Sequence, residues 1–294
     1  MSQRLSEFAD PASGNGTRQL PNRTRRSESI PRRLVAEGKY HLLPVYALLT
    51  TSDLAREGIR NSGSFRFADH IYRNEPSGRY GVGRLLDRVL LKLRGARSMR
   101  SRFFHSRREI LRVVREMAGV TTGQLTVLSV PCGIARDLYE VAETLHTTEP
   151  ALYEHVRFIG IDLDGEALDL SRELTQDHPT FDFQCADALA AGSLPGRLDA
   201  IVSLGFGEFL SDGMLYDFYR RCHSSLNPSG RFITSAMSRD RISDYLAREL
   251  AELYTHYRSA DQLVELLKSA GFAKVQTTHD EVGLQTLAVA EKVP

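Results

Sequence analysis

The sequence predicts an α/β fold, an open, doubly wound and mostly parallel seven-stranded sheet with an antiparallel C-terminal strand pair, preceded by an N-terminal helical cap. Three observations predict it. Strand and helix patterns alternate after Gly123, as parallel βαβ units require. No strand pattern occurs before Leu125. The last two strands are joined only by an Asp-Glu-Val-Gly turn at 280–283, which is too short for a parallel crossover.

The chain is expected to have three parts. Residues 1–33 are rich in Ser, Pro, Asn and Arg and poor in large apolar side chains, which predicts a flexible tail. Residues 34–122 form the helical cap, in which two helices are predicted over 82–93 and 107–117. The clearest cap helix spans 82–93, because its apolar residues recur every three or four positions. These residues are Val82, Leu85, Leu86, Val89, Leu90 and Leu93.

Residues 123–294 form the sheet domain. Its predicted strands cover 125–130, 156–163, 181–187, 198–205, 231–237, 273–279 and 284–292. Its predicted helices cover 135–146, 165–176, 212–226 and 260–270. In such an open sheet, ligands bind beyond the carboxyl ends of the parallel strands, so the residues that follow each strand are the candidates for a site.

The first strand runs into a small-residue turn, "VPCGIARD". Gly133, with the small residues Cys132 and Ala135 near it, lets the backbone approach a ligand closely. The plain alternative is a turn that needs one glycine for its own geometry. A dinucleotide site would need the pattern G-x-G-x-x-G to approach a pyrophosphate. Here Pro131 and Arg136 replace two of those glycines, which favours a nucleoside without a pyrophosphate.

Acidic residues follow the next two strands. Asp162, at the end of the second strand, is placed to accept hydrogen bonds from the hydroxyls of a ribose. Asp187, after the third strand, is placed to accept from an exocyclic amine such as that of adenine. An Asp at this position is more often a helix cap, but three such signals in order at three strand ends favour a nucleoside site.

These motifs carry a family resemblance. Residues 125–292 resemble the class I S-adenosylmethionine-dependent methyltransferase fold through "VLSVPCGIARD", "GIDLDGEAL", "CADAL", "LDAIVSLGFGEFLSD" and "LNPSGRFITS". The resemblance implies S-adenosylmethionine as the cofactor. The cofactor contacts it implies, together with two from the cap, are Asn74, Arg79, Ser129, Pro131, Cys132, Gly133, Asp162, Leu163, Asp187, Ala188 and Ser203. The chain departs from the family at Ser129, where an acid is usual. The segment "SLGFGEFLSD" matches neither the Asn-Pro-Pro-Tyr type of amino-group methylases nor the acid cluster of metal-dependent catechol methylases.

Four residues are the candidates for catalysis. Ser203 and Glu208 lie at and after the fourth strand, where they can contact an acceptor, although Glu208 also suits the first turn of a helix. Tyr72 and Tyr80 flank a Pro-Ser-Gly turn in the cap, where an aromatic face would attract a sulfonium. In the same stretch Arg79 could pair with the carboxylate of the amino acid, with Asn74 beside it. An ordinary polar turn explains this stretch equally well.

The reaction first expected is methyl transfer to a small molecule. The alternative is an enzyme of the same fold in which an amine attacks the γ-carbon of S-adenosylmethionine and methylthioadenosine leaves, forming an azetidine-2-carboxylate or transferring an aminocarboxypropyl group. A third class is a binding protein without turnover. Methylation of RNA is a weaker candidate, suggested by the basic residues of segment 84–115. More often, such a run is a solvated helix face that is partly paired with acids.

The composition of the chain limits the kinds of partner and cofactor that are expected. Lys+Arg 38 against Asp+Glu 37 gives a net charge of +1, which supplies no global argument for nucleic acid or a membrane as partner. A small-molecule substrate is therefore expected, nucleic acid is not favoured, and no membrane partner is expected. The oligomeric state is left open. Cys132, Cys185 and Cys222 lack paired spacing, which indicates reduced thiols in a cytoplasmic protein. No cluster has metal-ligand spacing, so no metal is expected.

Overall fold

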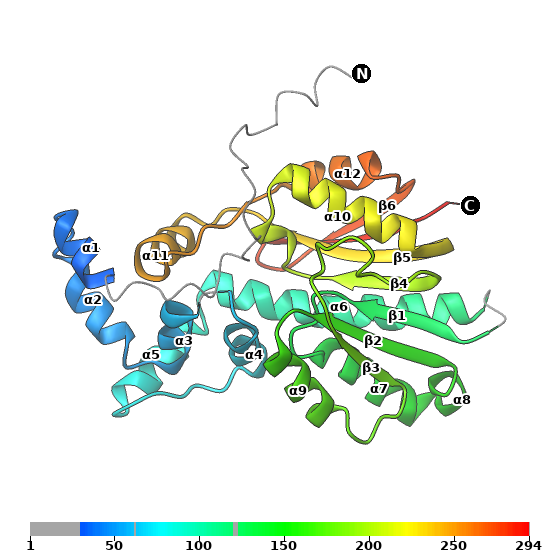
Figure 1. Ribbon diagram of the computed structural model, residues 1–294. Helices are drawn as coiled ribbons and strands as arrows, with labels where there is room; N and C mark the ends of the chain where they lie inside the picture. The colour runs from blue at the N-terminus through cyan, green and yellow to red at the C-terminus, as the bar shows by residue number, and fades with distance from the viewer. Residues whose placement is uncertain (1–29, 62, 120–122, 294) are drawn as a thin grey trace, which may run out of the picture.

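The computed structural model describes residues 30–61, 63–119 and 123–293. Its seven strands form one sheet in the order β3-β2-β1-β4-β5-β7-β6 (Figure 1). The strands are β1 Leu125–Ser129, β2 Val156–Asp162, β3 Phe181–Cys185, β4 Leu198–Ser203, β5 Leu226–Met237, β6 Lys274–His279 and β7 Gln285–Glu291. All pairs are parallel except β5 with β7 and β7 with β6. The predicted fold class is therefore confirmed.

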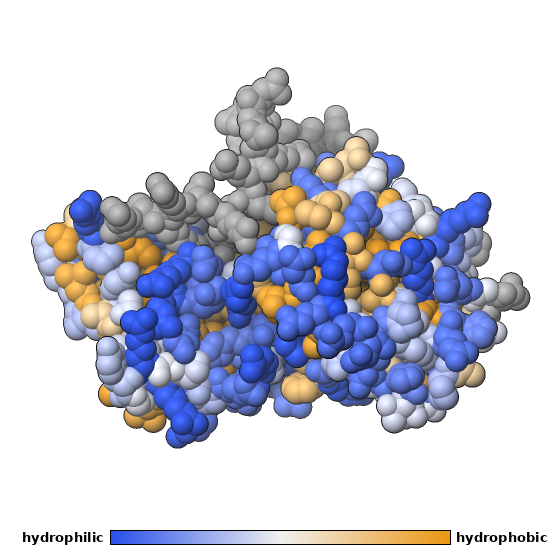
Figure 2. Space-filling model, turned by 60° about the horizontal axis from the view of Figure 1, so that its bottom comes forward, coloured by the Kyte–Doolittle hydropathy of each residue, from blue (hydrophilic) through white to orange (hydrophobic). Residues whose placement is uncertain are grey.

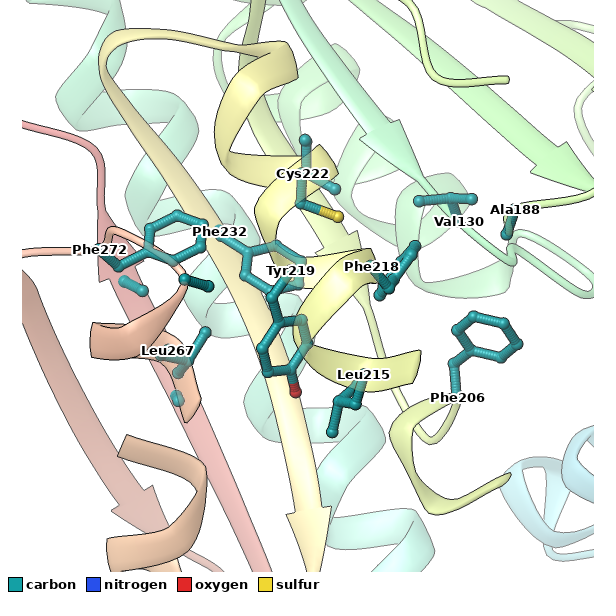
Figure 3. Close-up of a cluster of buried hydrophobic side chains, with 14 of the residues drawn as sticks. Val130, Ala188, Phe206, Leu215, Phe218, Tyr219, Cys222, Phe232, Leu267 and Phe272 are labelled. Atoms are coloured by element: carbon teal, nitrogen blue, oxygen red, sulfur yellow. The ribbon is translucent and has the colours of Figure 1, made fainter. Parts of the chain in front are cut away.

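Helices cover both faces of this sheet (Figure 1). On one face lie α10 Asp212–Ser225 and α12 Ala260–Ser269. Phe218 and Tyr219 of α10 are fully buried in one cluster with Phe232 of β5 and Phe272, as Figure 3 shows. Burying a side chain of this size contributes about 1.5–3 kcal/mol each.

The opposite face is covered by α6 Arg94–Ala118, α7 Arg136–Thr148 and α9 Gly165–Leu174, with the short α8 Pro150–Tyr153 following α7. The predicted helix over 107–117 is only the second half of α6. Here Ile110, Val113 and Met117 pack against strand residues such as Val127 and Ile233. The first half of α6 extends to the cap, so one continuous helix connects the cap to the sheet.

The cap consists of α1 Ile30–Ala36, α2 Leu42–Leu49, α3 Asp53–Arg60, α4 Phe65–Arg73 and α5 Val82–Leu90. The helix α11 Arg241–Ala251, which follows β5, packs against α1 and α3 and completes the cap (Figure 1). Leu250 of α11 is buried together with Ile30, Leu34 and Ile59. Helix α1 thus begins inside the range predicted as tail; residues 1–29 lie outside the described part of the chain.

The helix α5 confirms the position of the predicted helix but not its apolar face. Val82, Leu85 and Val89 are about half exposed, whereas Gly83 and Asp87 are buried. The hydrogen bonds of Asp87 explain this orientation of α5. The Asp87 carboxylate accepts hydrogen bonds from Ser52 Oγ, from Leu54 N at 3.2 Å and from Ser77 N at 3.0 Å, and its side chain is completely buried.

Gly83 explains why the helix cannot turn its apolar side inward. A Cβ atom at this position would lie 2.1 Å from the backbone oxygen of Thr51, so only glycine allows the start of α5 to lie this close to the turn between α2 and α3. Backbone packing at Gly83 and the donors around Asp87 together set the rotation of α5. The spacing of apolar residues along the sequence indicates neither the close contact at Gly83 nor the donors around Asp87.

No helix among the described residues is long and apolar enough to cross a membrane.

Candidate functional site

The turn after β1 meets the end of β2 at the carboxyl edge of the sheet. Cys132 N donates to Ile161 O at 2.9 Å, and Gly133 N donates to the Asp162 carboxylate (Oδ2) at 2.7 Å. Gly133 has φ +53°, a conformation that glycine adopts without strain. Ser171 of α9 closes the turn from behind, because its hydroxyl donates to Gly133 O and accepts from Ala135 N, both at 3.1 Å.

Asp162 is held rigidly by these backbone donors. Its second oxygen, Oδ1, accepts from Asp164 N at 2.8 Å. Burial raises the pKa of Asp162, while the backbone hydrogen bonds from Asp164 and Gly133 oppose that shift. Each carboxylate oxygen keeps a second lone pair for a ligand. The arrangement is thus a fixed carboxylate beside a close backbone turn, as the sequence predicts.

The residues that follow the third strand form a less distinct part of the candidate site. Asp187 Oδ1 accepts from Leu189 N at 2.8 Å, so this side chain caps its own turn. Ala188 is buried in the hydrophobic cluster beneath it, while Leu163 at the end of β2 is half exposed. Leu163 is therefore an apolar surface at the edge, next to the Asp162 carboxylate.

Two of the predicted residues lie inside the sheet. Ser129 pairs with Gly160 and Val202 as the last residue of β1, and Ser203 pairs with Thr234 as the last residue of β4. Both serines are almost completely buried. As buried residues within the sheet, they do not form an open surface for an acceptor.

Arg102 of α6 is the centre of a polar network at the same edge. Its Nη1 donates to Glu208 Oε1 at 3.0 Å, and its Nη2 donates to the hydroxyl oxygen of Tyr72 at 3.1 Å. Gln285 Nε2 also donates to Glu208 Oε1, at 3.3 Å. Only 5% of Arg102 is exposed, and its Nε has no hydrogen-bond partner among the described residues. Burial alone would lower the pKa of Arg102, but Tyr72 and Glu208 raise it above its ordinary value.

Gly205 lets the guanidinium lie against the turn after β4. This glycine has φ +73°, and a Cβ atom on it would lie 2.8 Å from Arg102 Nη1. The next turn, η2 Gly207–Phe209, carries Glu208. In the segment "SLGFGEF", Gly205 leaves room for the Arg102 guanidinium, and the Glu208 carboxylate pairs with that guanidinium.

Asp137, in the first turn of α7, stands near this network. Burial raises the pKa of Asp137 to about 6, although the hydrogen bond from Leu138 N and the charge of Arg102 oppose the shift. Asp137 lies four residues after Gly133 in the chain. A carboxyl group whose pKa is this far raised, close to a glycine turn, is typical of a functional site.

Sequence reasoning missed Arg102 by counting it among the basic residues of segment 84–115. A signal was present, since Arg102 falls on the same helical stripe as Ser98, Ser106 and Ile110, all of which are buried. Other cations of the segment pair with acids on the surface. These pairs are Arg107 with Glu140, Arg112 with Glu109 and Glu116, and Arg115 with Glu149.

The cap residues divide into two groups. Tyr72 joins the Arg102 network, and its ring stacks on Phe103 with 4.7 Å between centroids. The structure does not bring Asn74, Arg79 and Tyr80 to this edge. All three are exposed. Arg79 N donates to Thr51 O at 2.9 Å, and Asn74 is the C-cap of α4, where its N donates to His70 O at 3.2 Å.

A cleft of about 890 Å³ lies between α4, α7 and α9, and it also reaches Ile134 and Arg136, which follow Gly133 in the turn after β1. Its cations are already neutralised, since Arg136 pairs with Asp69 at 2.7 Å, Arg73 with Glu75 at 2.6 Å and Arg66 with Glu166. Within the described part of the chain, no group of three or more His, Cys, Asp or Glu residues could hold a metal ion.

Comparison with known proteins decides the family. The profile of the family described as "Putative methyltransferase" matches residues 50–292, most of the chain. The chain belongs to this methyltransferase family. No curated protein matches the sequence.

Solved structures show the same fold. A possible exported protein from Bordetella parapertussis is similar with a TM-score of 0.74 and 21% identity, over 90% of this chain and 93% of that one. Magnesium protoporphyrin IX methyltransferase from Synechocystis, with S-adenosylhomocysteine bound, is similar with a TM-score of 0.51 and 14% identity, over 76% of this chain and 93% of that one. These likenesses agree with the class I methyltransferase fold predicted for this family member.

Proposed function

We propose that this chain is an S-adenosylmethionine-dependent methyltransferase that acts on a small molecule. The observation that carries the proposal is the contact between Gly133 N and the Asp162 carboxylate at 2.7 Å, which joins the glycine turn to the end of β2. This pair offers a close backbone turn and a fixed acceptor for ribose hydroxyls. Membership of a methyltransferase family and the structures of its fold relatives support the same assignment.

The methionine end of the cofactor would be held by two groups that sequence reasoning did not find. Arg102 is nearly buried and keeps an unused Nε donor, which suits a carboxylate acceptor. The Asp137 carboxyl suits an ammonium group, and pairing with a cation would favour its ionised form. These roles replace those first expected for Arg79 and Asn74.

Catalysis would depend mainly on alignment. S-adenosylmethionine, when bound, supplies an electrophilic methyl group, and an in-line displacement gains most from holding the nucleophile close and oriented. Glu208 is already paired with Arg102 and Gln285, so we assign it to positioning rather than to proton removal. The Tyr72 hydroxyl accepts from Arg102 and can still donate to an acceptor molecule.

The pairing of surface charges supports a small acceptor over a nucleic acid. The second half of the basic segment pairs several of its cations with surface carboxylates, which leaves fewer charges for a phosphate backbone. A cytoplasmic location remains our inference from the free thiols of Cys132, Cys185 and Cys222.

Two measurements test this function. Calorimetric titration with S-adenosylhomocysteine is expected to show one site, and its absence would contradict the proposal. Incubation with S-adenosylmethionine alone is expected to leave the cofactor unchanged. Accumulation of methylthioadenosine above the rate without enzyme would instead indicate attack on the γ-carbon, the alternative reaction considered for this fold.

A further inference from the structure

The cap carries several large apolar side chains that are exposed to solvent. They lie on α2, on the turn at 79–81 and on α5, which contacts α2. These side chains are between 39% and 86% exposed. They are Val45, Leu48, Tyr80, Val82, Leu85 and Val89, called here the cap apolar face. In Figure 2, hydrophobic residues also gather at the end of the molecule where Figure 1 places the cap.

This exposure is built into the packing of the cap. Helix α5 directs its apolar stripe outward because Asp87 is held on the inner side by Ser52, Leu54 and Ser77. Gly83 fits tightly against Thr51 O on the same side. Contiguous exposed apolar surface is costly in water and typically marks an interaction site.

Three exposed cations lie beside the apolar residues of α5, and the same segment has no exposed acid. Arg84, Arg88 and Lys92 are exposed on and just after α5. Between residues 76 and 108 the sole acidic residue is Asp87, which is completely buried. Helix α2, "LLPVYALL", has no charged residue. The face therefore combines apolar side chains with a local excess of positive charge that the net charge of +1 for the whole chain conceals.

We infer that the cap apolar face docks on an anionic membrane surface. Basic amphipathic helices lie in the lipid interface, with their apolar side among the acyl chains and their cations at the headgroups. Pairing of two copies through this face is disfavoured, since a twofold contact would bring the same cations together, and segment 76–108 has no exposed acid to pair with them. Single-stranded nucleic acid would need several stacking aromatics, and the face offers Tyr80 alone.

Sedimentation with vesicles tests the inference on the full chain. We expect binding to vesicles that contain phosphatidylglycerol and little binding to vesicles of phosphatidylcholine alone. The variant Arg84→Gln/Arg88→Gln/Lys92→Gln should lower the partition coefficient roughly 100-fold, because each cation near an anionic surface contributes a factor of about five. Leu85→Ser should lower it about tenfold, since it removes buried apolar area.

Matched variants separate this face from general charge effects. Arg157→Gln/Arg172→Gln/Lys274→Gln removes three surface cations from the sheet domain, and Val293→Ser removes an exposed apolar residue near the C-terminus. Both should bind vesicles like the unmodified chain. Equal binding to both kinds of vesicle, or equal loss in the matched variants, would overturn the inference. A dimer without lipid that Leu85→Ser dissociates would assign the face to a second copy instead.

Discussion

Arg102 and Glu208 form a nearly buried ion pair between α6 and the turn after β4, with 3.0 Å between Nη1 and Oε1. The pair connects the helix that enters the cap to the edge where the parallel strands end. Removing one member of a buried pair leaves the other charge without compensation, so these residues should matter for stability as well as for binding.

The first prediction concerns this pair. Arg102→Ala should lower the free energy of unfolding by about 3–5 kcal/mol, because it leaves the Glu208 carboxylate buried without its partner. Urea denaturation measures the change. Arg112→Ala is the control, since Arg112 pairs with Glu109 on the same helix but its side chain is 39% exposed, and it should cost at most about 1 kcal/mol. Equal losses in the two variants would contradict the buried pair.

The second prediction concerns Gly205. Gly205→Ala should destabilise the chain and weaken binding of S-adenosylhomocysteine, because the added methyl group displaces the Arg102 guanidinium. Gly192→Ala is a matched control, since Gly192 has φ +75° but open space around it. Both variants carry the strain of a positive φ, about 1–2 kcal/mol, so only the difference between them reports on Arg102. Similar affinities in both would argue against a role for this contact.

The third prediction concerns the nucleoside. Asp162→Asn should weaken binding of S-adenosylhomocysteine by about 10- to 100-fold, the worth of a hydrogen bond to a charged group. Isothermal titration calorimetry is the measurement. Asp182→Asn, at the exposed pair of Asp182 with Arg157 on β3, should leave the affinity unchanged. An unchanged affinity in Asp162→Asn would remove the main support for the proposed cofactor site.

The fourth prediction is a pH dependence. The pKa of Asp137 rises from 3.8 to about 6 on folding, so between these values the folded chain binds more protons than the unfolded chain. The contribution of Asp137 to stability is therefore fully present below about pH 4 and is lost as the pH rises to about 6. A shift of this size corresponds to about 3 kcal/mol.

Asp137→Asn removes that titration and keeps an oxygen for Leu138 N. Its stability relative to the unmodified chain should increase by up to about 3 kcal/mol between about pH 4 and pH 7, as urea unfolding at both values can measure. The same variant should bind S-adenosylmethionine more weakly, because it lacks the charge for the ammonium group. A stability difference that is flat with pH would show that Asp137 titrates normally.

Much of the fold followed from local patterns. The apolar runs of the strands and the helical spacing between them predict the sheet, and the short turn at 280–283 predicts its antiparallel end. The same patterns predict that Asp162 and Gly133 lie close together, as their hydrogen bond shows. They follow neighbouring parallel strands, whose carboxyl ends must meet at one edge of the sheet.

The network around Arg102 depended on tertiary structure. Arg102 and Glu208 are 106 positions apart, and their contact requires α6 to cross the sheet at one angle, which no local pattern determines. The outward rotation of α5 likewise depends on donors from α3 and from the turn at Ser77 that surround Asp87. The sequence by itself determined the class of the sheet and placed the proposed nucleoside site after its strands, because hydrophobic period and the alternation of strands and helices along the chain are local properties. Only the tertiary structure decided which charges are buried and which apolar side chains of α5 are exposed. Whether a residue is buried depends on the residues that pack against it, and these are distant in the chain.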